Sequence, residues 1–186
     1  MWTPVVRRAV LAATTFALLA QVCAVAQQYH RTDLTTDSSA VSSSAPNIDP
    51  NLVNSWGLAR SSTSPWWIAD NGRGVSKLYN AAGVPQQFPI NGVLQQLIVK
   101  IPTPDGTGTA APTGSVFNPT SAFNVAPNTK AIFLFVTEDG TISGWNPMVN
   151  PTNAVIVKNR AGKAIHKGCA IGQTSSGHHD FMPPIL

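Results

Sequence analysis

The chain has 186 residues, enough for one domain with a hydrophobic core. Only 11% of the residues are charged and the formal net charge is +4, so the chain lacks the clustered Lys and Arg of a nucleic-acid-binding surface. The 14 Gly and 15 Pro argue against long helices, because both residues destabilise helix interiors. The composition favours a β-rich fold.

Residues 1–26 have the three parts of a secretory signal peptide. Two arginines, Arg7 and Arg8, supply the positive charge, and an apolar run follows from Ala9 to Ala20. The sequence Ala24-Val25-Ala26 then matches the small-x-small pattern of a cleavage site. The apolar run of about 12 residues is too short for a helix across a bilayer of roughly 30 Å. We therefore expect a secreted or periplasmic mature chain with no transmembrane segment.

Residues 27–50 are polar and rich in Ser, Thr and Asp, which is typical of a flexible arm. Cleavage would remove Cys23 and leave Cys169 as the one cysteine. Because a single cysteine forms no internal disulfide, the fold must depend on its core alone.

Short apolar runs alternate with turn signals from residue 51 to residue 177, which indicates strands joined by hairpins. Ile132–Thr137 (IFLFVT) is the clearest strand, because it is short and rich in β-branched and aromatic residues. Pro102–Gly114 is expected to be a long irregular loop. The other expected strands are Trp66–Ala69, Val75–Tyr79, Leu94–Ile101, Thr141–Trp145, Ala154–Val157 and Ala164–Lys167. The pattern predicts an all-β fold.

One hairpin occurs twice in the sequence. Residues 67–72 (WIADNG) precede residues 74–78 (GVSKL), and residues 135–140 (FVTEDG) precede residues 141–145 (TISGW). In both copies Asn-Gly or Asp-Gly is expected to supply the positive φ angles of a tight turn. A hairpin that returns at long spacing is typical of the blades of a β-propeller.

The number of blades is too small to close a propeller. A closed propeller has at least four blades, whereas residues 51–177 hold two to three units of this length. We therefore expect β-propeller-like hairpin blades in an incomplete, open array. A fragment of a longer protein, one part of an assembly and a small sandwich remain the alternatives. Residues 178–186 have no strand pattern and are expected to form an aberrant or disordered tail.

Four segments in order resemble an uncharacterised family of secreted bacterial proteins. They are residues 49–59 (DPNLVNSWGLA), 67–72 (WIADNG), 112–118 (PTGSVFN) and 137–147 (TEDGTISGWNP). The family is considered a six-bladed β-propeller of the NHL/TolB-like type and has no assigned activity. The resemblance runs from Tyr29 to Gly177 and implies that this chain matches the N-terminal half of longer members, in truncated form.

Four polar residues at the two hairpin turns are candidate metal ligands. Asp70, Asn71, Glu138 and Asp139 would bring oxygen atoms from successive blades to one end of the array. Such oxygen ligands suit Ca²⁺, and calcium-dependent lactonases with six blades bind metal through residues of this kind. Ordinary turn chemistry is the simpler explanation of the same residues. The sequence has no other cofactor-binding motif.

Three tryptophans are candidate ligand-binding residues. Trp56, Trp67 and Trp145 could form an aromatic platform for a carbohydrate or protein ligand. Each lies beside an expected strand, so packing in the core or between blades is the alternative.

The sequence contains no catalytic constellation. We therefore expect an exported, propeller-type binding or scaffold module of unknown biochemical activity rather than an enzyme. The alternative is a calcium-dependent hydrolase of the lactonase kind, which depends on the turn carboxylates. A third interpretation is a truncated product without function.

Overall fold

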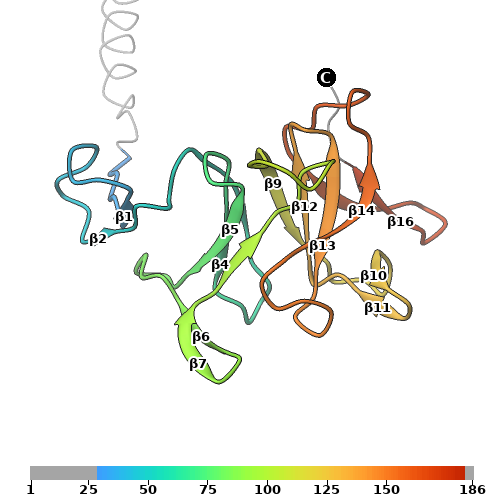
Figure 1. Cartoon of the computed structure of the whole chain (residues 1–186), viewed down its shortest axis with the longest axis horizontal. Coiled ribbons are helices and arrows are strands. Elements are labelled where there is room, and N and C mark those ends of the chain that lie inside the picture. The colour runs from blue at the N-terminus through green and yellow to red at the C-terminus, as the bar shows by residue number, and fades with distance from the viewer. Residues whose placement is uncertain (1–28, 183–186) are drawn as a thin grey trace, which may run out of the picture. The chain divides into compact units, whose positions relative to one another are not determined.

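The computed structural model describes residues 29–182, and their regular structure consists of β-strands (Figure 1). The all-β prediction is confirmed for this range. The chain divides into two compact units, Met1–Thr32 and Asp33–Leu186. Only residues 29–32 of the first unit are described, so the predicted signal peptide lies outside the described residues. Within residues 29–182 no helix has the length and hydropathy that a membrane crossing requires.

The first large sheet, here called sheet 1, has four antiparallel strands in chain order. They are β3 (Ser55–Ala59), β4 (Trp66–Asp70), β5 (Val75–Tyr79) and β8 (Ile98–Lys100).

The strand expected over residues 94–101 is divided in the structure. Its first part belongs to β7 (Val93–Gln96), which pairs with β6 (Gln87–Ile90) in a separate hairpin. Asn91 and Gly92 form the two-residue loop of this hairpin, both with positive φ (51° and 80°). Because such a loop holds the two strands in register, β7 pairs with β6 and only β8 joins sheet 1.

The second large sheet, here called sheet 2, repeats the topology of sheet 1. Its strands in chain order are β9 (Pro112–Phe117), β12 (Phe133–Thr137), β13 (Thr141–Trp145) and β14 (Val155–Asn159). A short hairpin of β10 (Asn124–Ala126) and β11 (Thr129–Lys130) interrupts the chain between β9 and β12. The hairpin repeated in the sequence supplies the two middle strands of each sheet. The loop expected over residues 102–114 ends earlier, because β9 begins at Pro112.

Sheet 1 and sheet 2 are here called the first two repeat units. A third repeat unit, called the third unit below, begins with a hairpin of β15 (Ala170–Gln173) and β16 (His179–Met182). The expectation of a disordered tail over 178–186 is therefore wrong for residues 179–182. A turn at Gly177 (φ 83°) reverses the chain, and the Thr174 N–H donates to the His178 carbonyl at 2.8 Å. The strand expected over residues 164–167 does not form; this segment follows a turn at Gly162 (φ 70°) and contributes no strand.

The polar arm is also more ordered than expected. Within residues 33–50, β1 (Thr35–Thr36) pairs in parallel with β2 (Asn47–Ile48). The arm ends at Asp49, which is buried and accepts hydrogen bonds from the Lys77 ammonium and, at 2.8 Å, from the Tyr79 hydroxyl. Burial alone would raise the pKa of Asp49, but its hydrogen bonds together hold that pKa below the ordinary value. The arm is therefore fixed to sheet 1 by a buried ion pair.

The hydrophobic core lies between the two sheets and is centred on Trp67 of β4. The Trp67 ring stacks on Phe133 of β12, with ring centroids 4.5 Å apart and an interplanar angle of 26°. The rings of Phe135 and Trp145 lie 6.1 Å and 4.7 Å from Trp67. Since these three partners belong to sheet 2, one side chain of sheet 1 joins both halves of the core.

The backbones of successive repeat units approach each other so closely that a side chain has no room between them. A Cβ atom on Gly57 of β3 would lie 2.7 Å from the backbone nitrogen of Ser115 in β9. A Cβ atom on Gly114 of β9 would lie 2.9 Å from the backbone nitrogen of Cys169, just before β15. A contact of the same kind, glycine against backbone, therefore links sheet 1 to sheet 2 and sheet 2 to the third unit.

The two repeated turns differ in detail. Gly140 has φ 85°, as the Asp-Gly motif predicts, but in the first turn the positive φ belongs to Gly74 (65°) rather than to Gly72. The first turn is one residue longer, so the residue before the returning strand is Gly74. Gly72 instead packs on Val53, whose Cγ1 would lie 2.7 Å from a Cβ at position 72.

The close approach of β3 and β9 gives a stability prediction. Gly57→Ala should lower the free energy of unfolding by about 1–3 kcal/mol, because backbone must move to accommodate the methyl group. Gly172→Ala is the matched control in β15, since the atom nearest to its Cβ, at 2.7 Å, is the terminal methyl of the exposed Met182. Urea denaturation would measure both, and equal losses would contradict the close approach.

Candidate functional site

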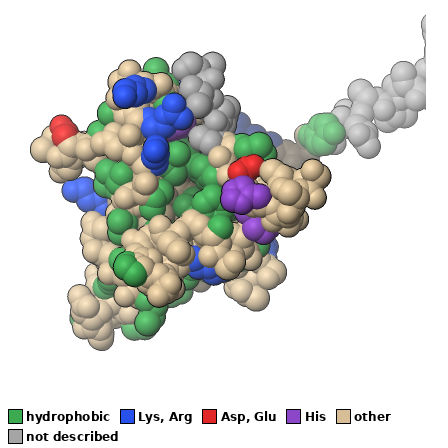
Figure 2. All heavy atoms as spheres, turned by 90° about the vertical axis from the view of Figure 1, so that its right-hand side faces the viewer, with side chains coloured by type: hydrophobic (Ala, Val, Ile, Leu, Met, Phe, Trp, Pro, Cys, Tyr) green, Lys and Arg blue, Asp and Glu red, His purple; other side chains and the backbone are tan. Residues whose placement is uncertain are grey.

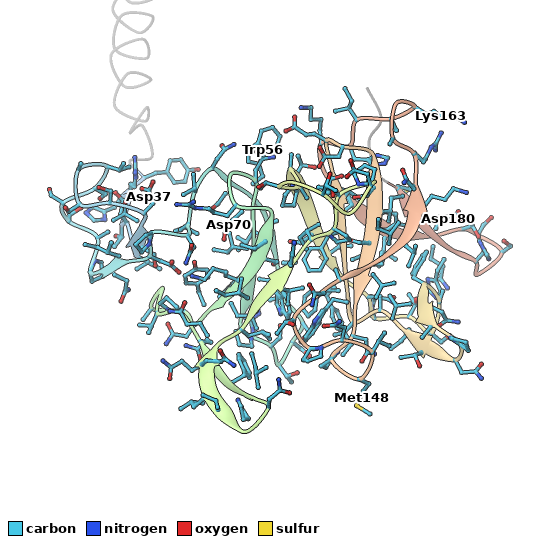
Figure 3. The ribbon with its side chains drawn as sticks, viewed as in Figure 1. Asp37, Trp56, Asp70, Met148, Lys163 and Asp180 are labelled. Carbon is cyan, nitrogen blue, oxygen red and sulfur yellow. The ribbon has the colours of Figure 1, made fainter. Side chains whose placement is uncertain are left out.

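The strands of the two sheets carry polar turns at one end and an apolar pocket at the other. Figure 3 shows Trp56 and Asp70 toward the first end and Met148, in the loop after β13, at the opposite end. β4 runs from Trp67, which lines the pocket, to Asp70 at the polar end. We describe the polar end first, because it carries the predicted metal ligands.

Five side chains at the polar end form a closed set of contacts, here called the polar ring. Trp56 Nε1 donates to Asn54 Oδ1 (3.1 Å), Asn54 Nδ2 donates to Asn71 Oδ1 (3.1 Å), and Asn71 Nδ2 donates to Glu138 Oε2 (3.2 Å). The other oxygen of Glu138 accepts from the Lys167 ammonium. Lys167 Nζ in turn lies 5.3 Å from the ring centroid of Trp56. The polar ring joins β3, both repeated turns and the segment before β15.

Glu138 is ionised within the polar ring. The hydrogen bond from Lys167, followed by the one from Asn71, lowers the pKa of the Glu138 carboxyl. Both side chains of the ion pair are about one-third exposed, so solvent screens their attraction and the pair contributes little to stability. The polar ring therefore holds its own side chains in place. The Glu138 carboxylate and the side-chain amides of Asn54 and Asn71 each have a protein partner.

The structure brings together two of the four predicted metal ligands. Asn71 and Glu138 are in direct contact, whereas Asp70 accepts from the Ser55 hydroxyl (2.6 Å) and Asp139 accepts from the Ala111 N–H (2.7 Å). Within residues 29–182 no three His, Cys, Asp or Glu side chains gather in a way that could hold a metal ion. Calcium binding through these residues stays a prediction.

Asp70 is buried without full compensation of its charge. One oxygen accepts from Ser55, and the other has no hydrogen-bond partner among the described residues. Burial raises the pKa of Asp70 to about 7, although the Ser55 hydrogen bond and the charge of Lys77 oppose the rise. The carboxyl therefore takes up its proton near neutral pH.

The apolar pocket has a volume of about 410 Å³, in the range of roughly 300–1,000 Å³ found for small-molecule sites. Its lining comes from sheet 1, sheet 2, the β6–β7 hairpin and the loops beside them. The lining contains no charged side chain: Ser64, Pro65, Trp67, Leu78, Phe88, Pro89, Ile90, Leu97, Ile132, Phe133, Trp145, Pro147 and Pro151.

The two tryptophans of the pocket differ in their hydrogen bonding. Trp145 Nε1 donates to the Pro151 carbonyl at 3.1 Å. Trp67 is only 2% exposed, and its Nε1 has no hydrogen-bond partner in the described part of the chain. A buried indole N–H usually has a partner, because leaving it unpaired costs free energy. Within residues 29–182 the Trp67 N–H is therefore a buried donor without a partner.

The three predicted ligand-binding tryptophans do not form a single platform. Trp67 and Trp145 line the pocket, whereas Trp56 is 46% exposed and belongs to the polar ring. The sequence analysis missed Phe88 and Ile90, which reach the pocket from the β6–β7 hairpin. The Asn91-Gly92 pair is the sequence signal of this hairpin, because both residues tolerate the positive φ angles of a two-residue loop.

Comparison with known proteins gives one weak similarity. No family model matches the chain, and no solved structure matches it. A stretch of 118 residues, 62% of this chain, is 29% identical to an uncharacterized protein of Acanthamoeba polyphaga mimivirus. The stretch covers 27% of the length of that curated relative. The similarity carries no information on activity.

The raised pKa of Asp70 predicts a specific pH dependence. The folded state binds the Asp70 proton more tightly than the unfolded chain, so this carboxyl contributes stability below about pH 4 and loses it as the pH rises through 7. Asp70→Asn keeps the size of the side chain and removes the ionisation. It should match the parent protein near pH 4 and be more stable at pH 8, by up to about 4 kcal/mol for a shift of about three pKa units.

Thermal melts of both proteins from pH 4 to pH 8 would measure this difference. The pKa of His166 is lowered by burial and, secondarily, by Arg160, so His166 changes stability with pH in the direction opposite to Asp70. Because both proteins contain His166, comparing them at the same pH cancels its contribution. Asp180→Asn removes the same charge from a half-exposed position, where the carboxylate lies 3.6 Å from His178 Nε2, and serves as the control. A stability difference between parent and Asp70→Asn that is constant with pH would contradict the assignment.

Proposed function

We propose that this chain is an exported binding module, built from propeller-type blades in an open array, that holds a small apolar molecule between its first two sheets. The observation that carries the proposal is the uncharged pocket between sheet 1 and sheet 2, lined by Trp67 and Trp145. Export is proposed from the signal-peptide pattern of residues 1–26.

The blade array is supported by the repetition of one topology. Sheet 1 and sheet 2 each have four antiparallel strands in chain order, and their first strands, β3 and β9, are in contact. The units begin at regular intervals, with Ser55, Pro112 and Ala170 as the first residues of β3, β9 and β15. Four-stranded units repeated around their first strands are the organisation of a propeller.

The openness of the array is supported by the surface of its later strands. Within residues 29–182, β15 and β16 pair in a two-stranded sheet. Figure 2 shows hydrophobic side chains at the surface on the side that carries β14 and β16. The exposed hydrophobic side chains of these strands include Val157 and Met182. Such a surface is suited to contact with further strands, as expected for an open array.

A small apolar ligand is supported by the chemistry of the pocket. Its walls are aromatic rings, aliphatic side chains and prolines, and no lining residue carries a charge. A carbohydrate needs many hydrogen-bonding groups, which this lining does not offer. A largely apolar molecule gains free energy from each part of its surface that leaves water. The proposal therefore narrows the binding function to apolar compounds of low molecular weight.

The pocket proposal predicts saturable binding of a neutral apolar dye. N-phenyl-1-naphthylamine should bind the protein with an increase in its fluorescence, because its ring system leaves water. Ile132→Trp fills the pocket with a larger side chain and should weaken binding by about tenfold or more.

The control is Leu94→Trp, which adds the same indole at a position that is 65% exposed and outside the pocket. It should leave the affinity unchanged. Thermal melts would establish that both variants are folded. Equal dye affinities in the parent and Ile132→Trp would refute the pocket as the binding site.

Calcium distinguishes this proposal from the hydrolase alternative. Of the predicted ligands, Asp139 lines a separate polar pocket of about 420 Å³ together with Asp105. If calcium bound there, millimolar calcium would raise the melting temperature by mass action. The binding-module proposal predicts no such rise. A rise of several degrees that Asp139→Asn abolishes would favour the calcium-dependent hydrolase instead.

A further inference from the structure

We infer that Asn91 is a site of spontaneous deamidation, and that the isoaspartate formed there displaces one wall of the apolar pocket. The sequence contains the pair Asn-Gly twice, at residues 71–72 and 91–92. Asn-Gly is the pair in which this reaction is fastest, because glycine has no Cβ to shield its backbone nitrogen. The surroundings of the two pairs differ, and only the second is free to react.

The modification needs no reagent other than water. The Gly92 backbone nitrogen attacks Cγ of Asn91 and loses its proton, and the side-chain amide nitrogen leaves as ammonia. The product is a five-membered succinimide ring. Water then opens this ring at either carbonyl: opening at the side-chain carbonyl gives aspartate, and opening at the backbone carbonyl gives isoaspartate. Both products replace a neutral amide by a carboxylate, and isoaspartate also adds one methylene group to the main chain.

The Asn91 side chain lies at the tip of a weakly supported hairpin. Within residues 29–182, β6 and β7 form a separate two-stranded sheet (Figure 1). Residues 91–95 are exposed, and a Cβ on Gly92 would have no atom within 4 Å. The Asn91 side chain has no hydrogen bond to this part of the chain. Because a hairpin of two strands is marginally stable, its tip opens readily and the Gly92 nitrogen can reach the amide.

The Asn71 side chain, by contrast, is held at both of its polar atoms. Its Oδ1 accepts from Asn54 Nδ2 at 3.1 Å, and its Nδ2 donates to Glu138 Oε2 at 3.2 Å. The nitrogen that would attack it is also engaged, since the Gly72 N–H donates to the Val53 carbonyl at 3.1 Å. Closure of a succinimide at this turn must break these hydrogen bonds, so the polar ring protects Asn71.

The consequence for the pocket follows from the register of the hairpin. Ile90 pairs with Val93 across the loop, and the length of the loop sets this register. An added methylene group makes the loop too long for the pairing, so β6 must shift against β7. Phe88 and Ile90 of β6 line the pocket, and their displacement opens that wall. This second step rests on the proposed binding function, whereas the deamidation does not.

Peptide mass spectrometry tests the deamidation with an internal control. The parent protein is kept at about pH 8 and 37 °C and digested with trypsin at intervals; Asn71 then lies in the peptide 61–73 and Asn91 in the peptide 78–100. In the folded protein Asn91 should react at least about tenfold faster than Asn71. In concentrated urea this difference should disappear, because both side chains are then free.

Two outcomes of this experiment would overturn the inference. Asn71 and Asn91 could react at equal rates in the folded protein, in which case the hydrogen bonds of Asn71 give no protection. Alternatively, the advantage of Asn91 could persist unchanged in urea, in which case the local sequence and not the fold distinguishes the two sites.

The effect on the pocket is measured by the affinity for N-phenyl-1-naphthylamine before and after ageing. The isoaspartate form of the parent, separated by anion exchange, should bind the dye about threefold more weakly or worse. Asn91→Gly is the control for ageing, because Gly-Gly suits the same loop and has no amide to lose. Asn91→Asp, measured fresh, adds the charge without the methylene group. Both variants should keep the affinity of the fresh parent.

Each result bears on a different part of the account. An unchanged affinity of the isoaspartate form, or an equal loss in fresh Asn91→Asp, would overturn the displacement of the pocket wall. Failure of the fresh parent to bind the dye would overturn the proposed function, and the mass spectrometry would still decide whether Asn91 is the modified site.

Discussion

The rest of the structure depends on the contact of Trp67 with Phe133. These two rings belong to different sheets, and each is buried almost completely. A buried aromatic side chain removes about 150–250 Å² from water, more than an aliphatic one. The stack therefore provides a large part of the attraction that holds sheet 1 against sheet 2. The contacts of Trp67 with Phe135 and Trp145 and the close approach of β3 to β9 add to it.

Two further features lie beside this stack. Between the first strands, β3 and β9, the sheets approach until only glycine fits at position 57. Toward the loops after β13, the rings and prolines leave a gap, which is the apolar pocket.

Strand alternation explains why neighbouring residues have unlike roles. Successive side chains of β4 point to opposite faces, so Trp67 and Ala69 face sheet 2, while Asp70 lies on the side of Lys77 and Asp49. The segment of β4 from Trp67 to Asp70 thus contributes both to the hydrophobic core and to a buried polar group. The polar ring beyond the strand ends then joins the two turns to β3 and to the third unit.

Local signals predicted the parts of the fold that depend on neighbouring residues. The runs around Trp67 and Phe135 and the turns that follow them gave the two central hairpins, because alternation and turn chemistry act over a few residues. Long-range contacts were not predictable in this way. The order of the arm depends on Asp49 meeting Lys77, which is 28 residues away.

The candidate site was predictable only in part for the same reason. Trp67 and Trp145 were selected for their residue type, and the structure brings them into one pocket. The remaining walls come from segments that no local pattern connects, such as Phe88 and Pro151. Within the described range 29–182 the buried N–H of Trp67 has no hydrogen-bond partner, and no sequence pattern encodes that.

The most direct test of the account is a thermal melt of the chain followed by circular dichroism in the near and the far ultraviolet. The near-ultraviolet signal reports the packed rings of Trp67, Phe133 and Trp145, and the far-ultraviolet signal reports the strands. The account predicts a strong near-ultraviolet signal that is lost in one cooperative transition together with the β-type signal. A β-type spectrum without a near-ultraviolet signal, or two separate transitions, would contradict a core shared by the two sheets.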